Sequence, residues 1–274
     1  MDNQEPAEVS HYTSVDVLPE FLKKKMPIYG THYQFLNDKT EKKYALGKID
    51  AYLKTTKYKD IFEKFKKKDY TVYIASFSTA ADDLNLWRAY APQGGFSIQF
   101  DEKQIDEAWK TQVWEKMKKT SDLFPAKDFT AITTVRYTDE DVAAYLEKQK
   151  TGIEEGVEAR LNLPEQANKE IYWTEKYIIY YRALSSCFVK HPAFKDEKEY
   201  RAAFVTKDCG NFEMVGGKPR ILLITLDPNK AIKSITVSPF GDFSENKLFA
   251  QLLCQRIGLK PSIVKKSSLC GIAR

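Results

Sequence analysis

Residues 71–78 read Thr-Val-Tyr-Ile-Ala-Ser-Phe-Ser, a run rich in β-branched and aromatic side chains that ends in two hydroxyl groups. Such a run predicts a buried strand. It follows residues 58–68, where Ile61, Phe62 and Phe65 have helical spacing and lysines lie on the opposite face. The centre of the chain therefore predicts a helix that leads into a core strand.

Other predicted elements extend outward from this segment without the even spacing of repeated βαβ units. Strands are expected at 9–14, 132–137, 200–205, 221–226, 235–237 and 262–266, with an alternating aromatic run at 28–36 and a strand at 96–100 that forms a hairpin-like unit with 71–78. Helices are expected at 15–25, 86–90, 105–117, 140–149, 166–189 and 245–257, with Gly258 as the last C-cap, and loops from 37 and over 210–219. This order predicts an α+β fold in which mixed or antiparallel sheets form a central cleft surrounded by helices.

Composition describes an ordinary globular protein. Of the 274 residues, 43% are hydrophobic and 13% aromatic, which is enough for a sizeable core. We expect a single domain over residues 1–274, with a helical insertion at about 101–190. The chain shows neither a basic start followed by an apolar run nor a stretch of membrane-spanning length, so we expect a cytoplasmic protein without a membrane partner.

Several site classes lack their sequence signatures. The four cysteines lie far apart, and the three histidines form no HExxH motif, so no metal centre is expected. GxSxG, P-loop and GxGxxG motifs are also absent. The net charge of +5 permits a nucleic-acid partner but shows no dense basic stripe that would indicate one.

Three polar clusters remain as candidates for chemistry. Glu197, Glu199 and Arg201 alternate along a predicted strand and would share one face. An exposed surface salt bridge is an equally good interpretation of these charges alone, but the apolar continuation at 202–205 favours the mouth of a core strand. Ser76 and Ser78 also share a face, although they would more simply begin a turn.

The third cluster is the segment 11–14, His11-Tyr12-Thr13-Ser14. A lone histidine near a strand end is more often structural than catalytic. Taken alone, this segment is the weakest of the three candidates.

Together, segments along the chain resemble a bacterial family, the domain of unknown function 2971. The resemblance lies in 11–14, 35–38 with Glu41, 75–78 with 83–84, 86–88 with Tyr90, 95–98 with 100–101, Lys190 with Phe194, 197–201, and a closing strand, helix and Lys-Ser segment. The layout is more distantly similar to the ADP-ribosyltransferase fold, in which an early His or Arg, a Ser-x-Ser-like or Tyr element on a middle strand and a late Glu, often as Glu-x-Glu, surround NAD.

The resemblance implies a role for each matching residue. Glu199 would hold the ribose hydroxyl and stabilise the cationic transition state, Glu197 would orient the acceptor or take the catalytic role in place of Glu199, and His11 would complete the catalytic set. The NAD-binding residues would be His11, Tyr12, Thr13, Ser76, Ser78, Trp87, Arg88, Tyr90 and Arg201, with stacking from Tyr12, Trp87 or Tyr90. Asn37, Asp38 and Glu41 would contact substrate or build the loop over it, with a local turn as the equal alternative.

The resemblance therefore implies an NAD-dependent mono-ADP-ribosyltransferase-like enzyme, a bacterial toxin or phage-defence effector that uses NAD as substrate and no metal. Its acceptor would be a protein or a nucleic acid, and a regulatory partner is compatible with it. One alternative is an NAD glycohydrolase or another nucleotide-processing enzyme. The other is a noncatalytic nucleotide-sensing or interaction module.

Overall fold

The computed structural model describes residues 6–38, 40–68, 70–113, 130–163, 169–206 and 212–271. The helices are α1 (Leu18–Phe21), α2 (Glu41–Leu53), α3 (Lys59–Phe65), α4 (Leu84–Tyr90), α5 (Glu102–Ala108), α7 (Asp139–Leu161), α8 (Glu170–Ser185), α9 (Pro228–Ala231) and α10 (Phe243–Ile257), with the short helical turns η1 (Tyr33–Phe35), η2 (Trp109–Val113), η5 (Pro192–Glu197) and η6 (Pro261–Ile263). The strands are β1 (Glu8–Ser14), β2 (Met26–His32), β3 (Thr71–Ser78), β4 (Gly95–Asp101), β5 (Thr130–Thr134), β6 (Glu199–Thr206), β7 (Glu213–Val215), β8 (Lys218–Leu226), β9 (Ile232–Val237) and β10 (Val264–Lys266).

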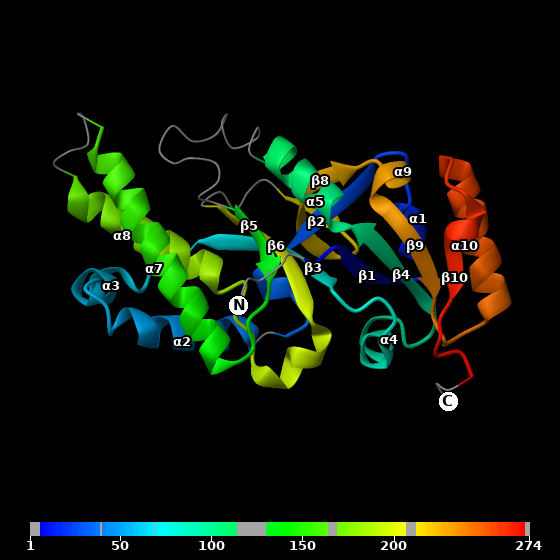
Figure 1. Cartoon of the computed structure of the whole chain (residues 1–274), viewed down its shortest axis with the longest axis horizontal. Helices are drawn as coiled ribbons and strands as arrows, with labels where there is room; N and C mark the ends of the chain where they lie inside the picture. The colour runs from blue at the N-terminus through cyan, green and yellow to red at the C-terminus, as the bar shows by residue number, and fades with distance from the viewer. Residues whose placement is uncertain are drawn as a thin grey trace.

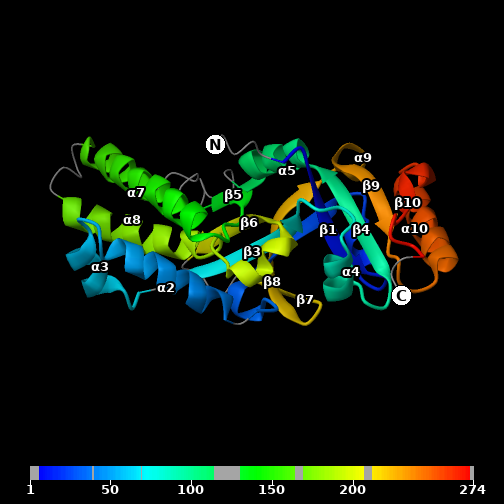
Figure 2. The same ribbon diagram turned by 60° about the horizontal axis from the view of Figure 1, so that its bottom comes forward.

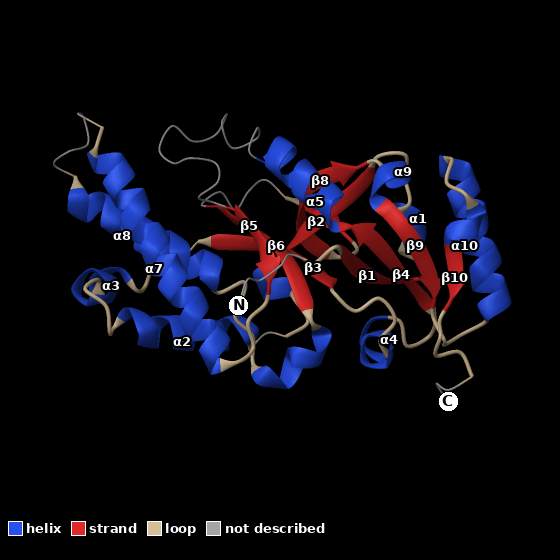
Figure 3. Ribbon diagram, viewed as in Figure 1, coloured by secondary structure: helices blue, strands red, loops and turns tan. Residues whose placement is uncertain are grey.

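In the described part of the chain, these strands form one mixed sheet of ten strands. β9 and β10 pair in parallel, and the other pairs of named strands are antiparallel. Figure 3 shows the sheet between helices at both ends of the molecule. The predicted α+β class is confirmed.

β3 is the strand at which the sheet divides. Along one edge it pairs with β6 over its whole length, from Thr71 to Ser78. Along the other edge it pairs with β2 at Tyr73 and Ile74, and with β1 only at Ser78. β1 and β2 therefore share one edge of β3 end to end, and residues 75–77 lie between their points of attachment.

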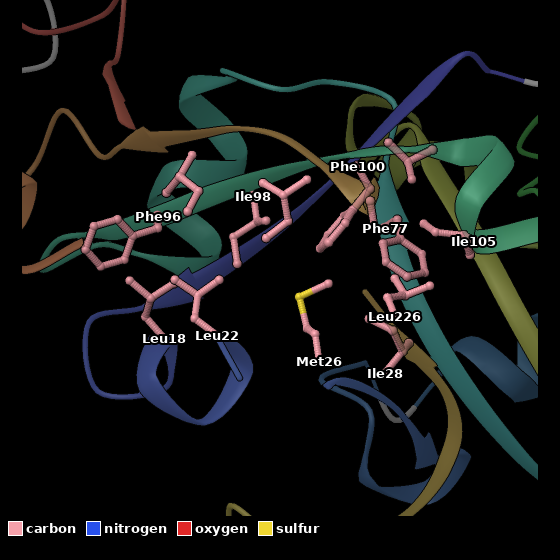
Figure 4. Close-up of a cluster of buried hydrophobic side chains, with 14 of the residues drawn as sticks. Leu18, Leu22, Met26, Ile28, Phe77, Phe96, Ile98, Phe100, Ile105 and Leu226 are labelled. Atoms are coloured by element: carbon pink, nitrogen blue, oxygen red, sulfur yellow. The ribbon is translucent and has the colours of Figure 1, made fainter. Parts of the chain in front are cut away.

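Two hydrophobic clusters hold the faces of the sheet. One packs β1, β3 and β4 against α1, α5 and α10, and Figure 4 shows Phe77, Ile98 and Phe100 facing Leu22 and Met26 within it. The other packs the opposite face of β3 and β6 against α2, α3, α7 and α8, which gather at one end of the molecule in Figures 1 and 2. β3 and β6 contribute to both clusters because successive side chains of a strand point to opposite faces.

Most predicted elements lie where the hydrophobic pattern placed them. The strands expected at 9–14, 71–78, 96–100, 200–205, 221–226 and 235–237, and the helices at 58–68 and 86–90, are confirmed within a few residues. The predicted helix 245–257 is also confirmed, with Gly258 as its left-handed C-cap at φ 88°. The expected ends at 114–117 and 166–168 lie outside the described residues.

Three local predictions were wrong, and helix α2 was missed. The helix expected at 15–25 is only the short α1, because the chain turns at Leu22 so that Met26 can start β2 in the core. The loop expected from 37 ends at α2, whose narrow apolar stripe of Ala45, Ile49 and Leu53 lies among lysines. β3 and β4 form no hairpin, because β1 lies between them. The described part of 210–219 includes β7, which forms a hairpin with β8.

The segment 101–190, expected to be a helical insertion, holds α5, α7 and α8. It also holds β5, which pairs with β6 in the same sheet. The division into domains stays a prediction.

Gly95 is required where β4 lies against β1. A Cβ atom there would lie 2.2 Å from the Thr13 carbonyl oxygen, which no relaxation of a side chain would relieve. We expect Gly95→Ala to lower the free energy of unfolding by about 2–4 kcal/mol in chemical denaturation. Gly47→Ala in α2 is the control, because its Cβ would meet nothing within 4 Å and should stabilise the helix by about 0.5–1 kcal/mol. An equal effect of the two variants would contradict this account of the β1–β4 contact.

Candidate functional site

A cavity of about 600 Å³ opens where β1 and β2 diverge along β3. This volume is within the range of small-molecule sites. Most of the predicted site residues line it, namely His11, Tyr12, Thr13, Asn37, Asp38, Glu41, Ser76, Ser78, Tyr90, Glu197, Glu199 and Arg201. The fold thus brings together segments that are up to 190 residues apart in the sequence.

The strand register places the key polar side chains on one face. Ser78 lies opposite Glu199, and Ser76 lies opposite Arg201. Directly opposite residues of an antiparallel pair project from the same face. The predicted shared face of Ser76 with Ser78, and of Glu199 with Arg201, is therefore confirmed.

Glu197 reaches the same cluster by a different route from the one predicted. It ends η5 rather than belonging to β6, because Lys198 adopts the left-handed conformation at φ 46° and breaks the alternation. Its carboxylate nevertheless accepts from Lys190 Nζ at 2.8 Å and from the Tyr90 hydroxyl at 3.3 Å. Ser78 Oγ fixes the segment by donating to the Glu197 carbonyl oxygen at 2.8 Å.

Arg201 is the centre of a buried charge cluster, not of a surface salt bridge. Its guanidinium, 2% exposed, donates to both carboxylate oxygens of Glu41 and lies 2.5 Å from Glu199 Oε2. It also donates to the Cys187 carbonyl oxygen at 2.9 Å. Glu41, predicted to contact substrate or build a loop, is instead 5% exposed in the first turn of α2 and binds Arg201.

Lys190 is the second cation of this cluster. Its ammonium group lies 2.8 Å from Glu197, 3.5 Å from Glu41 and 3.6 Å from Glu199 Oε1. Three carboxylates thus meet two cations. If all were ionised, the cluster would carry one uncompensated negative charge in a region that water hardly reaches.

The pKa shifts of Glu199 and Glu41 indicate which of these two carboxyl groups is protonated more readily. Burial raises the pKa of Glu199, and the nearby Glu41 and Glu197 carboxylates add to the rise against the opposing effect of Arg201 and Lys190. For Glu41, burial also raises the pKa, but Arg201 and Lys190 outweigh it and the net shift is downward. Glu199 is therefore the carboxyl group of this pair that accepts a proton more readily.

His11 approaches the cavity from the other face of the sheet. Its neighbour Ser10 lies opposite Ser78, so Ser10 shares the face of Glu199 and His11 does not. The imidazole donates from Nδ1 to the Ser76 carbonyl oxygen at 3.1 Å and stacks on Phe21 with ring centroids 5.0 Å apart. Burial lowers its pKa, which favours the neutral ring.

Two predicted NAD-binding residues lie away from the cavity. Trp87 is fully buried, donates from its indole nitrogen to Asp82 at 2.7 Å and meets the Tyr12 ring edge-on, so it cannot stack on a ligand. Arg88 is exposed and does not line the cavity, because α4 packs on β1 through Leu86 and Trp87. The Tyr12 hydroxyl is also engaged, with the Ala80 carbonyl oxygen and the Asp83 amide.

Asn37 and Asp38 lie at the rim of the cavity in front of α2. Asp38 Oδ1 accepts from the Thr40 amide at 2.8 Å and from the Thr40 hydroxyl at 2.7 Å, the local turn that was the alternative interpretation. Asn37 accepts from Lys218 Nζ at 3.4 Å.

Sequence reasoning missed most of the cationic residues that line the cavity, Lys190 and Arg220 among them. Lys190 follows an apolar segment and carried no motif beyond its place in the family resemblance. Arg220 lies in β8, in a stretch where only the following apolar run was interpreted. Neither position could be assigned before the strands were paired.

Glu41 should be essential to stability, because its removal leaves Arg201 with one carboxylate instead of two. We expect Glu41→Gln to lower the free energy of unfolding by about 2–4 kcal/mol at pH 7. Since the pKa of Glu41 is lowered in the folded state, its contribution is present above the unfolded value of 4.5 and is lost as the pH falls below it. The difference from the unsubstituted protein should therefore shrink in denaturation experiments below about pH 4.

Glu63→Gln is the matched control for this experiment. Glu63 pairs with Lys66 at the surface, where water screens the two charges and the pair adds little to stability. Equal losses of unfolding free energy in the two variants would show that the buried Glu41–Arg201 pair stabilises the fold no more than a surface pair does.

Comparisons with known proteins give one match. Residues 86–202 match the family model described as Protein of unknown function (DUF2971). No curated protein and no solved structure matches the chain. Within the described residues, no helix combines the length and apolar character needed to cross a membrane. The matched stretch runs from α4 into β6 and includes Tyr90, Lys190, Glu197, Glu199 and Arg201, and it supports the resemblance to this family of unknown function.

Proposed function

We propose that this chain is an NAD-dependent ADP-ribosyltransferase-like enzyme that cleaves the bond between nicotinamide and ribose. The observation that carries the proposal is Glu199, a carboxyl group with a raised pKa that lines a cavity of about 600 Å³ at the split of the sheet. Glu197 lies two residues before it and also lines the cavity. A late Glu-x-Glu pair beside a middle Ser-x-Ser strand is similar to the layout of the ADP-ribosyltransferase fold.

Glu199 has one oxygen for the protein and one for a ligand. Oε2 lies 2.5 Å from Arg201, and Oε1 lies 3.6 Å from Lys190 Nζ. In the proposed site, Oε1 accepts a hydrogen bond from a ribose hydroxyl. Arg201 and Glu41 act as positioning residues that hold the carboxylate in this orientation.

The reaction breaks one bond and forms one. The electron pair of the glycosidic bond leaves with the nicotinamide nitrogen and neutralises its positive charge, while positive charge develops on the ribose. The Glu199 carboxylate stabilises that charge, as carboxylates do at other oxocarbenium-like centres. The acceptor X–H then bonds to the anomeric carbon, and its proton passes to Glu197 and on to solvent.

A nucleotide-sensing module is the second candidate. The observation that favours it is the pairing of the Glu199 and Glu197 carboxylates with cations of the protein itself. In that case the same cavity binds a nucleotide without turnover.

Glu199→Gln should remove catalysis while keeping the fold. The amide has nearly the same volume, and Arg201 retains Glu41. We expect nicotinamide release and transfer of label from NAD to cell extract to fall at least about 100-fold. Glu197→Gln is the matched variant, which should lose transfer but keep nicotinamide release. A Glu199→Gln protein as active as the parent would sink the proposal.

The other outcomes of this assay are equally distinct. Nicotinamide release without transfer in the parent protein identifies a glycohydrolase. Binding of NAD without turnover identifies the sensing module. If a folded sample neither binds NAD nor turns it over, NAD is excluded as the ligand.

The pH dependence should report Glu199 directly. Because it acts as a carboxylate and its pKa is raised, kcat/KM should increase with pH through a midpoint above 4.5, the usual value for Glu. Glu41 contributes to that raised pKa, so Glu41→Gln should move the midpoint to lower pH. If the midpoint stays the same in Glu41→Gln, the loss of kcat/KM at low pH comes from a group other than Glu199.

A further inference from the structure

The cavity contains a second guanidinium, that of Arg220, which plays no part in the charge cluster around Arg201. Arg220 in β8 lies opposite Thr31 in β2, and Thr31 lies opposite Ile74 in β3. Ile74 shares its face with Ser76, two residues on in the same strand. Arg220 and Glu199 therefore face the same side of the sheet, on opposite sides of the central strand.

Arg220 differs from Arg201 in forming no ion pair with the carboxylates near it, Glu213, which lies opposite it in β7, and Glu20. No carboxylate among the described residues lies within ion-pair distance of its guanidinium, and its buried Nε atom, like that of Arg201, has no hydrogen-bond partner. Burial lowers the pKa of Arg220, and the more distant Glu20 and Tyr29 oppose that effect only in part. A partly buried charge without an ion-pair partner costs stability, so its position calls for an anion that the described residues do not provide.

The surroundings of Arg220 leave room for that anion. The guanidinium lies under the β7–β8 turn, where a Cβ atom on Gly216 would come no closer than 3.9 Å to its Nη2 atom. Gly216 and Gly217 adopt φ angles of 58° and 71°, a conformation that favours glycine. These two turn positions therefore carry no side chain. Lys218, two residues before Arg220, lines the same cavity and places a second cation there.

We propose that Arg220, assisted by Lys218, is the subsite for a phosphate group of the ligand, so that the cavity takes a nucleotide with a pyrophosphate rather than a nucleoside. An arginine fork matches phosphate oxygens in a bidentate geometry. With the sugar at Glu199 across β3, the phosphates extend beneath the β7–β8 turn. The sugar end of this assignment rests on the proposed function, whereas the phosphate subsite requires no turnover.

The test is calorimetric binding of ADP-ribose, inorganic pyrophosphate and adenosine to the full chain. We expect Arg220→Met to weaken ADP-ribose and pyrophosphate at least about 10-fold and to leave adenosine unchanged, and Arg220→Lys to restore part of the loss. Arg256→Met, at an exposed arginine of α10 outside the cavity, is the matched control and should bind as the parent does. Unchanged pyrophosphate and ADP-ribose binding in Arg220→Met, or none in the parent, would overturn the proposal.

Thermal unfolding separates a binding role from a structural one. Without ligand, Arg220→Met should unfold at the same or a higher temperature than the parent, because an unpaired charge is removed. A lower Tm without ligand would mean that Arg220 supports the fold, which overturns the proposal. Pyrophosphate should raise the Tm of the parent and not that of Arg220→Met.

Two further measurements complete the test. Competition between ligands shows whether the bound phosphate belongs to a nucleotide or to a nucleic acid, and Glu199→Gln separates this proposal from the proposed function. ADP-ribose should displace pyrophosphate, and a short single-stranded oligonucleotide that displaces it more tightly would overturn the assignment to a nucleotide. Glu199→Gln should retain pyrophosphate binding, since its side chain lies across β3 from Arg220. If pyrophosphate binds through Arg220 and NAD is not turned over, the subsite stands while the transferase fails.

Discussion

The buried contact of Arg201 with Glu41 and Glu199 is the interaction on which the rest of the site depends. It joins the first turn of α2 to the start of β6, two elements separated by 160 residues along the chain. A guanidinium that is 2% exposed cannot rely on water, so both carboxylates must stay in place for the fold to be stable. The same requirement fixes the orientation of Glu199 toward the cavity.

The cavity itself is a consequence of how the sheet is paired. β6 covers one edge of β3 completely, while β1 and β2 divide the other edge between them. Each of the two then continues into its own group of strands, β4 and β9 beyond β1, and β8 beyond β2. A separate hydrophobic cluster packs on each face of the sheet, and the first of them includes residues from both groups of strands.

The two arginines of the cavity divide stability and binding between them. Arg201 is paired with two carboxylates of the protein, although its buried Nε atom has no hydrogen-bond partner, and in the proposed site it acts as a positioning residue. Arg220 has no such partners among the described residues and stays in a partly buried position at the expense of stability. Functional sites are where proteins retain such unfavourable arrangements, because the ligand completes them.

The sequence alone determined the class of the fold, the core strand at 71–78 and the alternation that puts Glu199 with Arg201 and Ser76 with Ser78. These features follow from the period-2 pattern of side chains along a strand, which is local. Tertiary structure alone decided that Glu41 completes the Arg201 pair, that Glu197 joins from a turn, that Trp87 is buried, and that Arg220 faces the cavity. Those outcomes depend on strand pairing and on contacts between residues far apart in the chain, and no local pattern encodes which distant charge a buried guanidinium will meet.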